Sequence, residues 1–123
     1  MLKYFLMFFA FIMPIAACAK DDSHSNLSKE ELKKMVIIDV RTQAEWNSGH
    51  LEDAILIPLD VITKEITDKV KDKNTPIALY CRSGRRSGIA TQQIRQMGYT
   101  NVENYGSFNQ ASQTLNKKLV TSK

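Results

Sequence analysis

The sequence predicts a small α/β domain built on a mostly parallel sheet, because short apolar runs alternate with segments of helical periodicity. Residues 35–40 form an apolar run broken only by Asp39, and residues 76–80 form a second run that begins at a proline. Such runs are typical of strands covered on both faces. After an export segment, the chain has room for one domain of about 100 residues. In a sheet of this kind, ligands bind at the C-terminal ends of the strands.

Local signals along the chain predict the individual elements. Ser28 and Glu31 have the spacing of a capping box, Pro58 ends an apolar run, Asp60 is suited to cap a helix, and Gly98 is suited to end one. Strands that alternate with helices imply right-handed crossover connections. We expect strands at residues 35–40, 54–57, 76–80 and 101–105, and helices at 28–34, 42–48, 60–70, 87–97 and 108–119.

Residues 1–19 have the pattern of a secretion signal, with Lys3 followed by an apolar run and then by small residues. Two processing sites compete. The small residues fit ordinary cleavage before Lys20, whereas the four residues that end at Cys18 resemble the lipobox of bacterial lipoproteins, in which cleavage precedes a lipidated cysteine. We favour lipidation of Cys18.

The expected organisation is therefore a signal peptide, a polar tether at residues 20–27, and one domain at residues 28–120. The expected location is the bacterial periplasm, with or without a membrane anchor. Membrane contact is expected only through lipid on Cys18, since several acyl chains hold a protein firmly. We expect a monomer.

Residues 81–87, with the sequence Cys-Arg-Ser-Gly-Arg-Arg-Ser, are the most informative segment of the chain. Cys81 follows the second apolar run, so its sulfur is expected at the C-terminal end of a strand. The residues after the loop have helical periodicity, so the loop leads into a helix N-terminus. Unpaired N–H groups and the helix dipole make such a position suitable for an anion.

A thiolate is an anion of this kind. An ordinary cysteine, with a pKa of about 8.5, is only a few per cent thiolate at neutral pH. A helix end and loop N–H groups favour the ionised form, so the loop predicts an activated nucleophile. Cys81 also has no evident disulfide partner, and an unpaired cysteine in an oxidising compartment is exposed to damage unless it is used or buried. A buried structural cysteine is the alternative, but it requires neither Gly84 nor three arginines nearby.

Charge and motifs exclude several other classes of function. The formal net charge is +4, but the lysines are interspersed with acids, which indicates a solvated surface and not a nucleic-acid-binding one. The sequence has no signal for a metal site, a Walker loop or a dinucleotide fingerprint. We expect no metal and no cofactor.

Several segments together resemble the rhodanese family of sulfurtransferases, in its single-domain form and especially its small exported members of the phage-shock type. The resemblance covers residues 36–105, and the family fold is an α/β domain with a central parallel sheet of about five strands. The matching segments are Asp39-Val40-Arg41, Glu45-Trp46, Gly49-His50, Ala54, Ile57-Pro58, Cys81 through Ser87, and Met97-Gly98-Tyr99.

The resemblance implies that Cys81 attacks the outer sulfur of a donor such as thiosulfate, holds it as a persulfide, and passes it to cyanide or a thiol. Backbone N–H groups of the loop would then cradle the sulfur, and its arginines would attract the dianionic donor. The implied substrate-binding residues are Arg82, Ser83, Gly84, Arg85, Arg86 and Ser87. The implied supporting residues are Asp39, Arg41, Glu45 and His50.

The chain departs from the family pattern at a few positions. Asp53 stands where a glycine is usual, although aspartate tolerates a left-handed turn better than most residues. Gly106-Ser107 replaces a Gly-Gly pair, and the tryptophan of the final helix is missing. These departures concern the packing of the C-terminal part and not the loop.

Two other functions remain open. The architecture also resembles cysteine phosphatases and arsenate reductases, whose loops place five residues between cysteine and arginine. Here four residues separate Cys81 from Arg86, and the expected arginine position holds Ser87. The second alternative is a non-catalytic module that carries persulfide for a partner or senses it.

Overall fold

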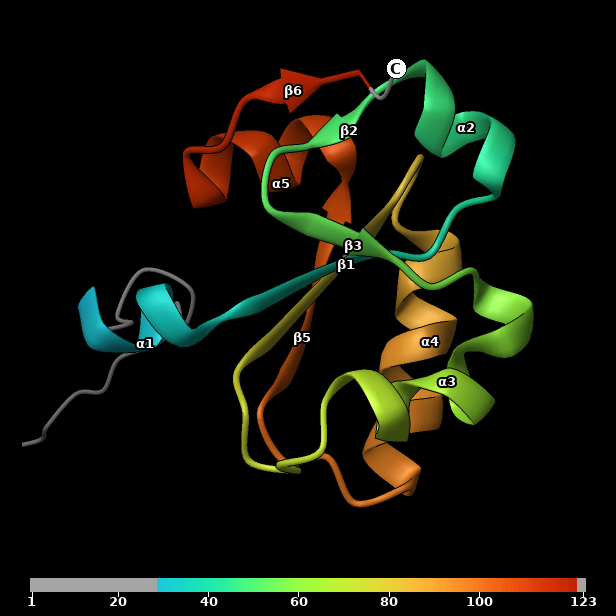
Figure 1. Cartoon of the computed structure of the whole chain (residues 1–123), viewed down its shortest axis with the longest axis vertical. Helices are drawn as coiled ribbons and strands as arrows, with labels where there is room; N and C mark the ends of the chain where they lie inside the picture. The colour runs from blue at the N-terminus through green and yellow to red at the C-terminus, as the bar shows by residue number, and fades with distance from the viewer. Residues whose placement is uncertain (1–28, 122–123) are drawn as a thin grey trace, which may run out of the picture.

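The computed structural model describes residues 29–121 and shows a four-stranded, fully parallel sheet in the order β3-β1-β4-β5 (Figure 1). Because the strands are parallel, their C-terminal ends lie at one edge of the sheet. The strands are β1 (Val36–Asp39), β3 (Ala54–Leu56), β4 (Ile77–Cys81) and β5 (Val102–Ser107).

Helices cover both faces of the sheet (Figure 1). Helices α3 and α4 lie on one face, and α5 lies on the other together with a two-stranded antiparallel sheet. The helices are α1 (Lys29–Lys34), α2 (Gln43–Ser48), the 3-10 turn η2 (Leu59–Val61), α3 (Ile62–Lys69), α4 (Arg85–Gln96) and α5 (Phe108–Leu115). The small sheet pairs β2 (His50–Leu51) with β6 (Leu119–Val120).

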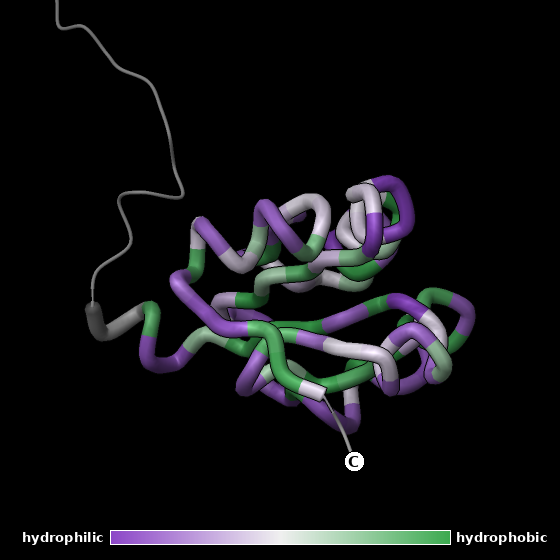
Figure 2. Tube along the Cα trace, turned by 90° about the horizontal axis from the view of Figure 1, so that it is seen from above, coloured by the Kyte–Doolittle hydropathy of each residue, from purple (hydrophilic) through white to green (hydrophobic). Residues whose placement is uncertain are grey.

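The core consists of two apolar layers separated by the sheet. Ile38 packs on the α3 and α4 side with Leu79 and Ile94, whereas its neighbour Ile37 packs on the other side with Tyr80. This alternation follows from the period of two along a strand. In Figure 2 hydrophobic positions run along the inner segments, and hydrophobic and hydrophilic positions alternate along the surrounding helices. Both faces of β4 are therefore buried, as its apolar sequence predicts.

The predicted parallel α/β fold is confirmed. Within the described part of the chain, the central sheet has four strands where the resemblance implied about five. Asp60 does not cap a helix, because it lies inside η2, and α3 begins only at Ile62 with Val61 at its N-cap position. The last helix ends at Leu115, since Asn116 adopts a left-handed conformation.

Asp53 has a φ of 68°, so the aspartate at the usual glycine position takes up the left-handed turn that was expected of it. The expected signal peptide, tether and Cys18 lie outside the described residues. Over residues 29–121, no helix is both long enough and apolar enough to span a membrane.

Candidate active site

Cys81 lies at the C-terminal end of β4, between β1 and β5, and its side chain is fully buried. Among the described residues, Cys81 is a free cysteine that forms no disulfide bond. β4 is buried along its whole length because both neighbouring strands and both helix layers cover it. This placement puts the sulfur where ligands of parallel sheets bind.

A short turn brings Cys81 onto the N-terminus of α4. Gly84 is the N-cap residue of α4 and has a φ of 94°, a left-handed conformation that favours glycine. The Gly84 N–H donates to Cys81 Sγ at 3.0 Å, and the Ser87 N–H, from the first turn of the helix, donates at 3.5 Å. The sulfur therefore accepts hydrogen bonds from backbone groups at the positive end of the helix dipole.

Two opposing effects act on the pKa of the Cys81 thiol. Burial alone would raise the pKa, because it disfavours the charged form. Hydrogen bonds from the side chain and N–H group of Ser87, and from the N–H groups of Ser83 and Gly84, lower it. The net pKa lies below that of an ordinary cysteine, so the fold favours the nucleophilic thiolate.

The three arginines of the loop differ in their surroundings. Arg82 and Arg85 are exposed. Arg86 is partly buried and donates to both carboxylate oxygens of Glu45 on α2, at 2.9 and 3.0 Å. This ion pair lowers the pKa of Glu45 to about 2. The charge of Arg86 is thus balanced within the protein, whereas Arg82 and Arg85 present theirs to solvent.

Asp39 and Arg41 form a buried ion pair beside the site. Arg41 donates to Asp39 at 2.7–3.0 Å through its side chain, and Nη2 also donates to the Gly49 carbonyl at 2.6 Å. Gly49 is the C-cap residue of α2. Burial would lower the pKa of Arg41, but the hydrogen bond and charge of Asp39 raise it overall. The pair therefore anchors the helix that carries Glu45.

His50 contacts Trp46 of α2. Its Nδ1 lies 3.1 Å from the Trp46 carbonyl oxygen, and its ring stacks on Trp46 with centroids 3.5 Å apart. His50 is thus a packing and hydrogen-bonding residue of the α2–β2 connection.

Within residues 29–121, no group of three or more His, Cys, Asp or Glu side chains could hold a metal ion.

Sequence reasoning missed two residues close to the loop. Asn104 of β5 hydrogen-bonds to Ser87 and Gly84, and Phe108 of α5 lies under the Arg41 guanidinium, 5.1 Å from ring centroid to Cζ. Phe108 also lines a cavity of about 350 Å³ with Arg82 and Glu45. One signal was present for Asn104: a polar amide near the end of a strand whose neighbour carries the cysteine.

Three comparisons agree with this arrangement. The rhodanese-like domain family matches residues 21–114. The chain is 44% identical over 69 residues to the thiosulfate sulfurtransferase PspE of Escherichia coli, a match that covers 56% of this chain and 66% of that protein. It is 34% identical over 74 residues to a sulfurtransferase of Allochromatium vinosum, covering 60% and 67%. The chain thus spans about two thirds of the length of these relatives.

A solved rhodanese with anions from E. coli superimposes with a TM-score of 0.66 at 35% identity, covering 72% of this chain and 99% of that one. The family match covers most of the described domain, and the structural match includes nearly all of the solved protein. Together with a thiol held at the helix N-terminus beside the strand ends, these findings show that the chain belongs to the rhodanese-like domain family.

Proposed function

We propose that the protein is a thiosulfate sulfurtransferase with Cys81 as the nucleophile and sulfur carrier. One observation carries this proposal. The sulfur of Cys81 accepts hydrogen bonds from the N–H groups of Gly84 and Ser87, and the pKa of the Cys81 thiol is lowered. The relatives named as sulfurtransferases support the same activity.

In the first step, the Cys81 thiolate attacks the outer sulfur of thiosulfate. A new S–S bond forms, the S–S bond within thiosulfate breaks, and sulfite leaves with the electron pair of that bond. In the second step, a nucleophilic acceptor such as cyanide or a thiolate attacks the outer sulfur of the persulfide. The Cys81–sulfur bond breaks and the thiolate of Cys81 is restored, so the cycle needs no outside oxidant or reductant.

The loop supports both steps. N–H groups aimed at Cys81 Sγ stabilise the attacking thiolate before reaction and again after the sulfur leaves. We assign attraction of the dianionic donor mainly to Arg82 and Arg85, which are exposed, since Glu45 balances the charge of Arg86. Ser83, Gly84 and Ser87 contribute the turn itself.

The direct test is formation of thiocyanate from thiosulfate and cyanide by the purified protein. Cys81→Ser should abolish the reaction, because serine lacks an ionisable thiol, while Asn101→Ala on the exposed turn before β5 should leave it unchanged. Mass spectrometry should show a gain of one sulfur atom on Cys81 after thiosulfate treatment. Absence of transfer from every sulfane donor, together with absence of that mass gain, would refute the proposal. A mass gain without turnover would indicate the carrier or sensor alternative.

We also propose that the protein is exported to the bacterial periplasm and anchored through lipid on Cys18. The support is the N-terminal sequence, with its basic start, apolar run and lipobox-like ending. Fractionation of wild-type protein and of Cys18→Ala tests the anchor. The variant should leave the membrane pellet. If it stays in the pellet and is still processed normally, the anchor proposal fails.

A further inference from the structure

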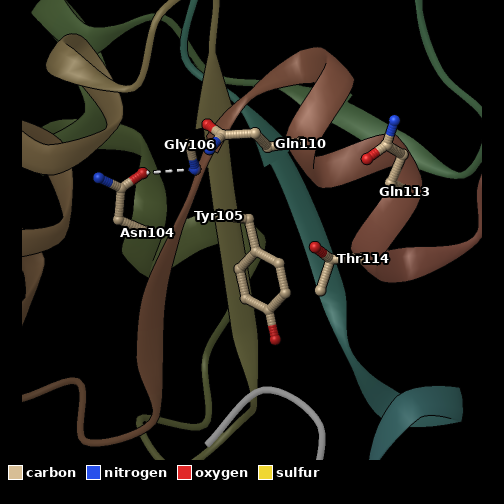
Figure 3. A pocket seen from close by; sticks show the side chains of 6 residues that line it. All are labelled: Asn104, Tyr105, Gly106, Gln110, Gln113 and Thr114. Atoms are coloured by element: carbon tan, nitrogen blue, oxygen red, sulfur yellow. Dashed lines mark hydrogen bonds between the residues drawn. The ribbon is translucent and has the colours of Figure 1, made fainter. Parts of the chain in front are cut away.

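Asn104 of β5 directs its side chain toward the active-site turn. It lies two residues before Gly106, on the strand that pairs with β4. Figure 3 shows that its amide leaves β5 on the side opposite to Tyr105, away from the side chains of the polar pocket on α5. The Asn104 amide is therefore used on the face of the strand that carries α4.

Three hydrogen bonds engage this amide. Oδ1 accepts from the Ser87 hydroxyl at 2.6 Å and from the Gly106 N–H at 2.9 Å, and Nδ2 donates to the Gly84 carbonyl at 3.1 Å. A side-chain amide offers an oxygen with two lone pairs and an N–H donor together, which matches these three partners. Gly84 and Ser87 are the residues whose N–H groups point at Cys81 Sγ. Asn104 thus holds both residues whose N–H groups donate hydrogen bonds to the sulfur.

The surrounding backbone leaves room for this contact. A side chain at Gly88 would place its Cβ 3.2 Å from Asn104 Nδ2, and one at Gly84 would place its Cβ 3.2 Å from the Cα of Gly106. Glycine at these positions lets α4 and the end of β5 approach closely. The contact between the Asn104 amide and the loop is accordingly a tightly packed one.

The Ser87 hydroxyl has one proton and two acceptors within reach. Asn104 Oδ1 lies 2.6 Å away and Cys81 Sγ lies 3.6 Å away. The shorter contact is the stronger of the two, because hydrogen-bond strength falls with distance, so the Ser87 hydroxyl gives the sulfur only the weaker hydrogen bond. The closer donors to the sulfur are the backbone N–H groups, at 3.0 and 3.5 Å, and their aim depends on the residue that holds the turn.

We propose that Asn104 is a positioning residue, which aims the N–H groups of Gly84 and Ser87 at Cys81 and thereby stabilises the thiolate. The consequence for sulfur transfer rests on the proposed function, but the effect on the thiol does not. The hydrogen bonds of the Asn104 side chain go to Ser87, Gly84 and Gly106 and not to Cys81 Sγ, so Asn104 acts through the turn.

The effect of the Asn104 hydrogen bonds on the Cys81 thiol can be measured separately from the effect of the nearby charges. Arg86 of α4 interacts electrostatically with Cys81 and is paired with Glu45 of α2. Asp39 of β1 is paired with Arg41. On β5, Glu103 is half-exposed and pairs with Arg95. Replacing Asn104 by alanine changes none of these charges, so a change in thiol titration reports the hydrogen bonds.

The test is the pH profile of alkylation of Cys81 by iodoacetamide in the full chain, followed by mass analysis of the Cys81 peptide. In Asn104→Ala, the midpoint should move to higher pH, with Cys81 reacting about three- to tenfold more slowly near neutral pH and equally fast at alkaline pH. Asn101→Ala, an exposed asparagine that precedes the same strand, should keep the wild-type profile.

Asn104→Leu keeps a neutral side chain of nearly the same shape but removes both the acceptor oxygen and the donor to Gly84. It should move the midpoint in the same direction, and it carries the test if Asn104→Ala fails to fold. A wild-type midpoint in a folded Asn104 variant would overturn the proposal, since it would mean a purely structural role. A lower midpoint in Asn104→Ala would also overturn it, since it would mean that the released Ser87 proton serves the sulfur.

This readout separates the inference from the proposed function. Alkylation requires no sulfur donor, so a shifted midpoint in a protein without transferase activity would support the role of Asn104 and reject the proposed reaction. Transfer by the wild type together with an unshifted midpoint would do the reverse.

Discussion

The active-site turn is held from two sides by different kinds of interaction. On the side of α2, Glu45 accepts two charge-assisted hydrogen bonds from Arg86, and both side chains are partly exposed, at 24% and 29%. On the side of β5, Asn104 holds Gly84 and Ser87 with a neutral amide. The first attachment is sensitive to pH and salt, whereas the second is not. The protein thus places its ionic contact at the surface and its neutral contact on the two residues whose N–H groups reach the sulfur.

The largest expected loss of folding free energy comes from breaking the buried Asp39–Arg41 pair, which anchors the helix that carries Glu45. Asp39→Ala leaves the Arg41 guanidinium, 4% exposed, without its carboxylate. A buried charge that loses its partner costs about 3–5 kcal/mol of folding free energy. Urea unfolding measures this loss.

The matched control is Glu103→Ala, which breaks the half-exposed pair between Glu103 and Arg95. Exposed pairs contribute about 0–1 kcal/mol, so this variant should lose little. Equal losses in Asp39→Ala and Glu103→Ala would contradict a structural role for the buried pair.

The contact between Asn104 and the turn can be disturbed at Gly106, whose N–H group donates to Asn104. The φ of Gly106 is 85°, and a Cβ there would collide with the Gln110 side chain, which forms the capping box of α5 with Ser107. Gly106→Ala should destabilise the fold by about 1–2 kcal/mol, because a left-handed conformation is unfavourable for alanine. It should also slow alkylation of Cys81, since the Gly106 N–H binds Asn104.

Gly98→Ala is the control for backbone strain. Gly98 also has a positive φ, 106°, but it follows α4 at the end distant from the turn. A comparable loss in thermal stability with an unchanged alkylation profile is expected. If both variants slow alkylation equally, the neutral side has no particular connection to the sulfur.

The smallest loss of folding free energy is expected from breaking the ion pair between Glu45 and Arg86. Glu45→Gln keeps an acceptor for the Thr42 N–H but removes the charge that faces Arg86. The loss at neutral pH should be about 1 kcal/mol for a partly exposed pair. Urea unfolding at several pH values and salt concentrations measures it.

The sign of its pH dependence follows from the lowered pKa. Glu45 titrates at about 2 in the folded protein, against an ordinary value of 4.5. The stabilisation is therefore complete above the ordinary value and disappears as the pH falls through the folded value. The gap between wild type and Glu45→Gln should close over that interval and should narrow in high salt. A gap that persists in strong acid would mean that Glu45 acts through packing.

Much of the fold and of the site follows from local sequence. The apolar run that forms β4 and the amphipathic segment that forms α4 place Cys81 between a strand and a helix without reference to the rest of the chain. The prediction for the final helix was less accurate, because a left-handed Asn116 ends it early and β6 returns to pair with β2. Strand pairing of this kind depends on residues that are far apart in the chain.

The sequence by itself determined the family, the parallel α/β fold and the turn that carries Cys81. The turn could be predicted locally, because the N–H groups that reach the sulfur lie within six residues of Cys81. Only the tertiary structure decided what holds that turn. Arg86 and Glu45 are 41 positions apart, and Ser87 and Asn104 are 17 apart. A parallel sheet brings the C-terminal ends of separate strands together, and spacing along the chain does not reveal which polar side chains meet there.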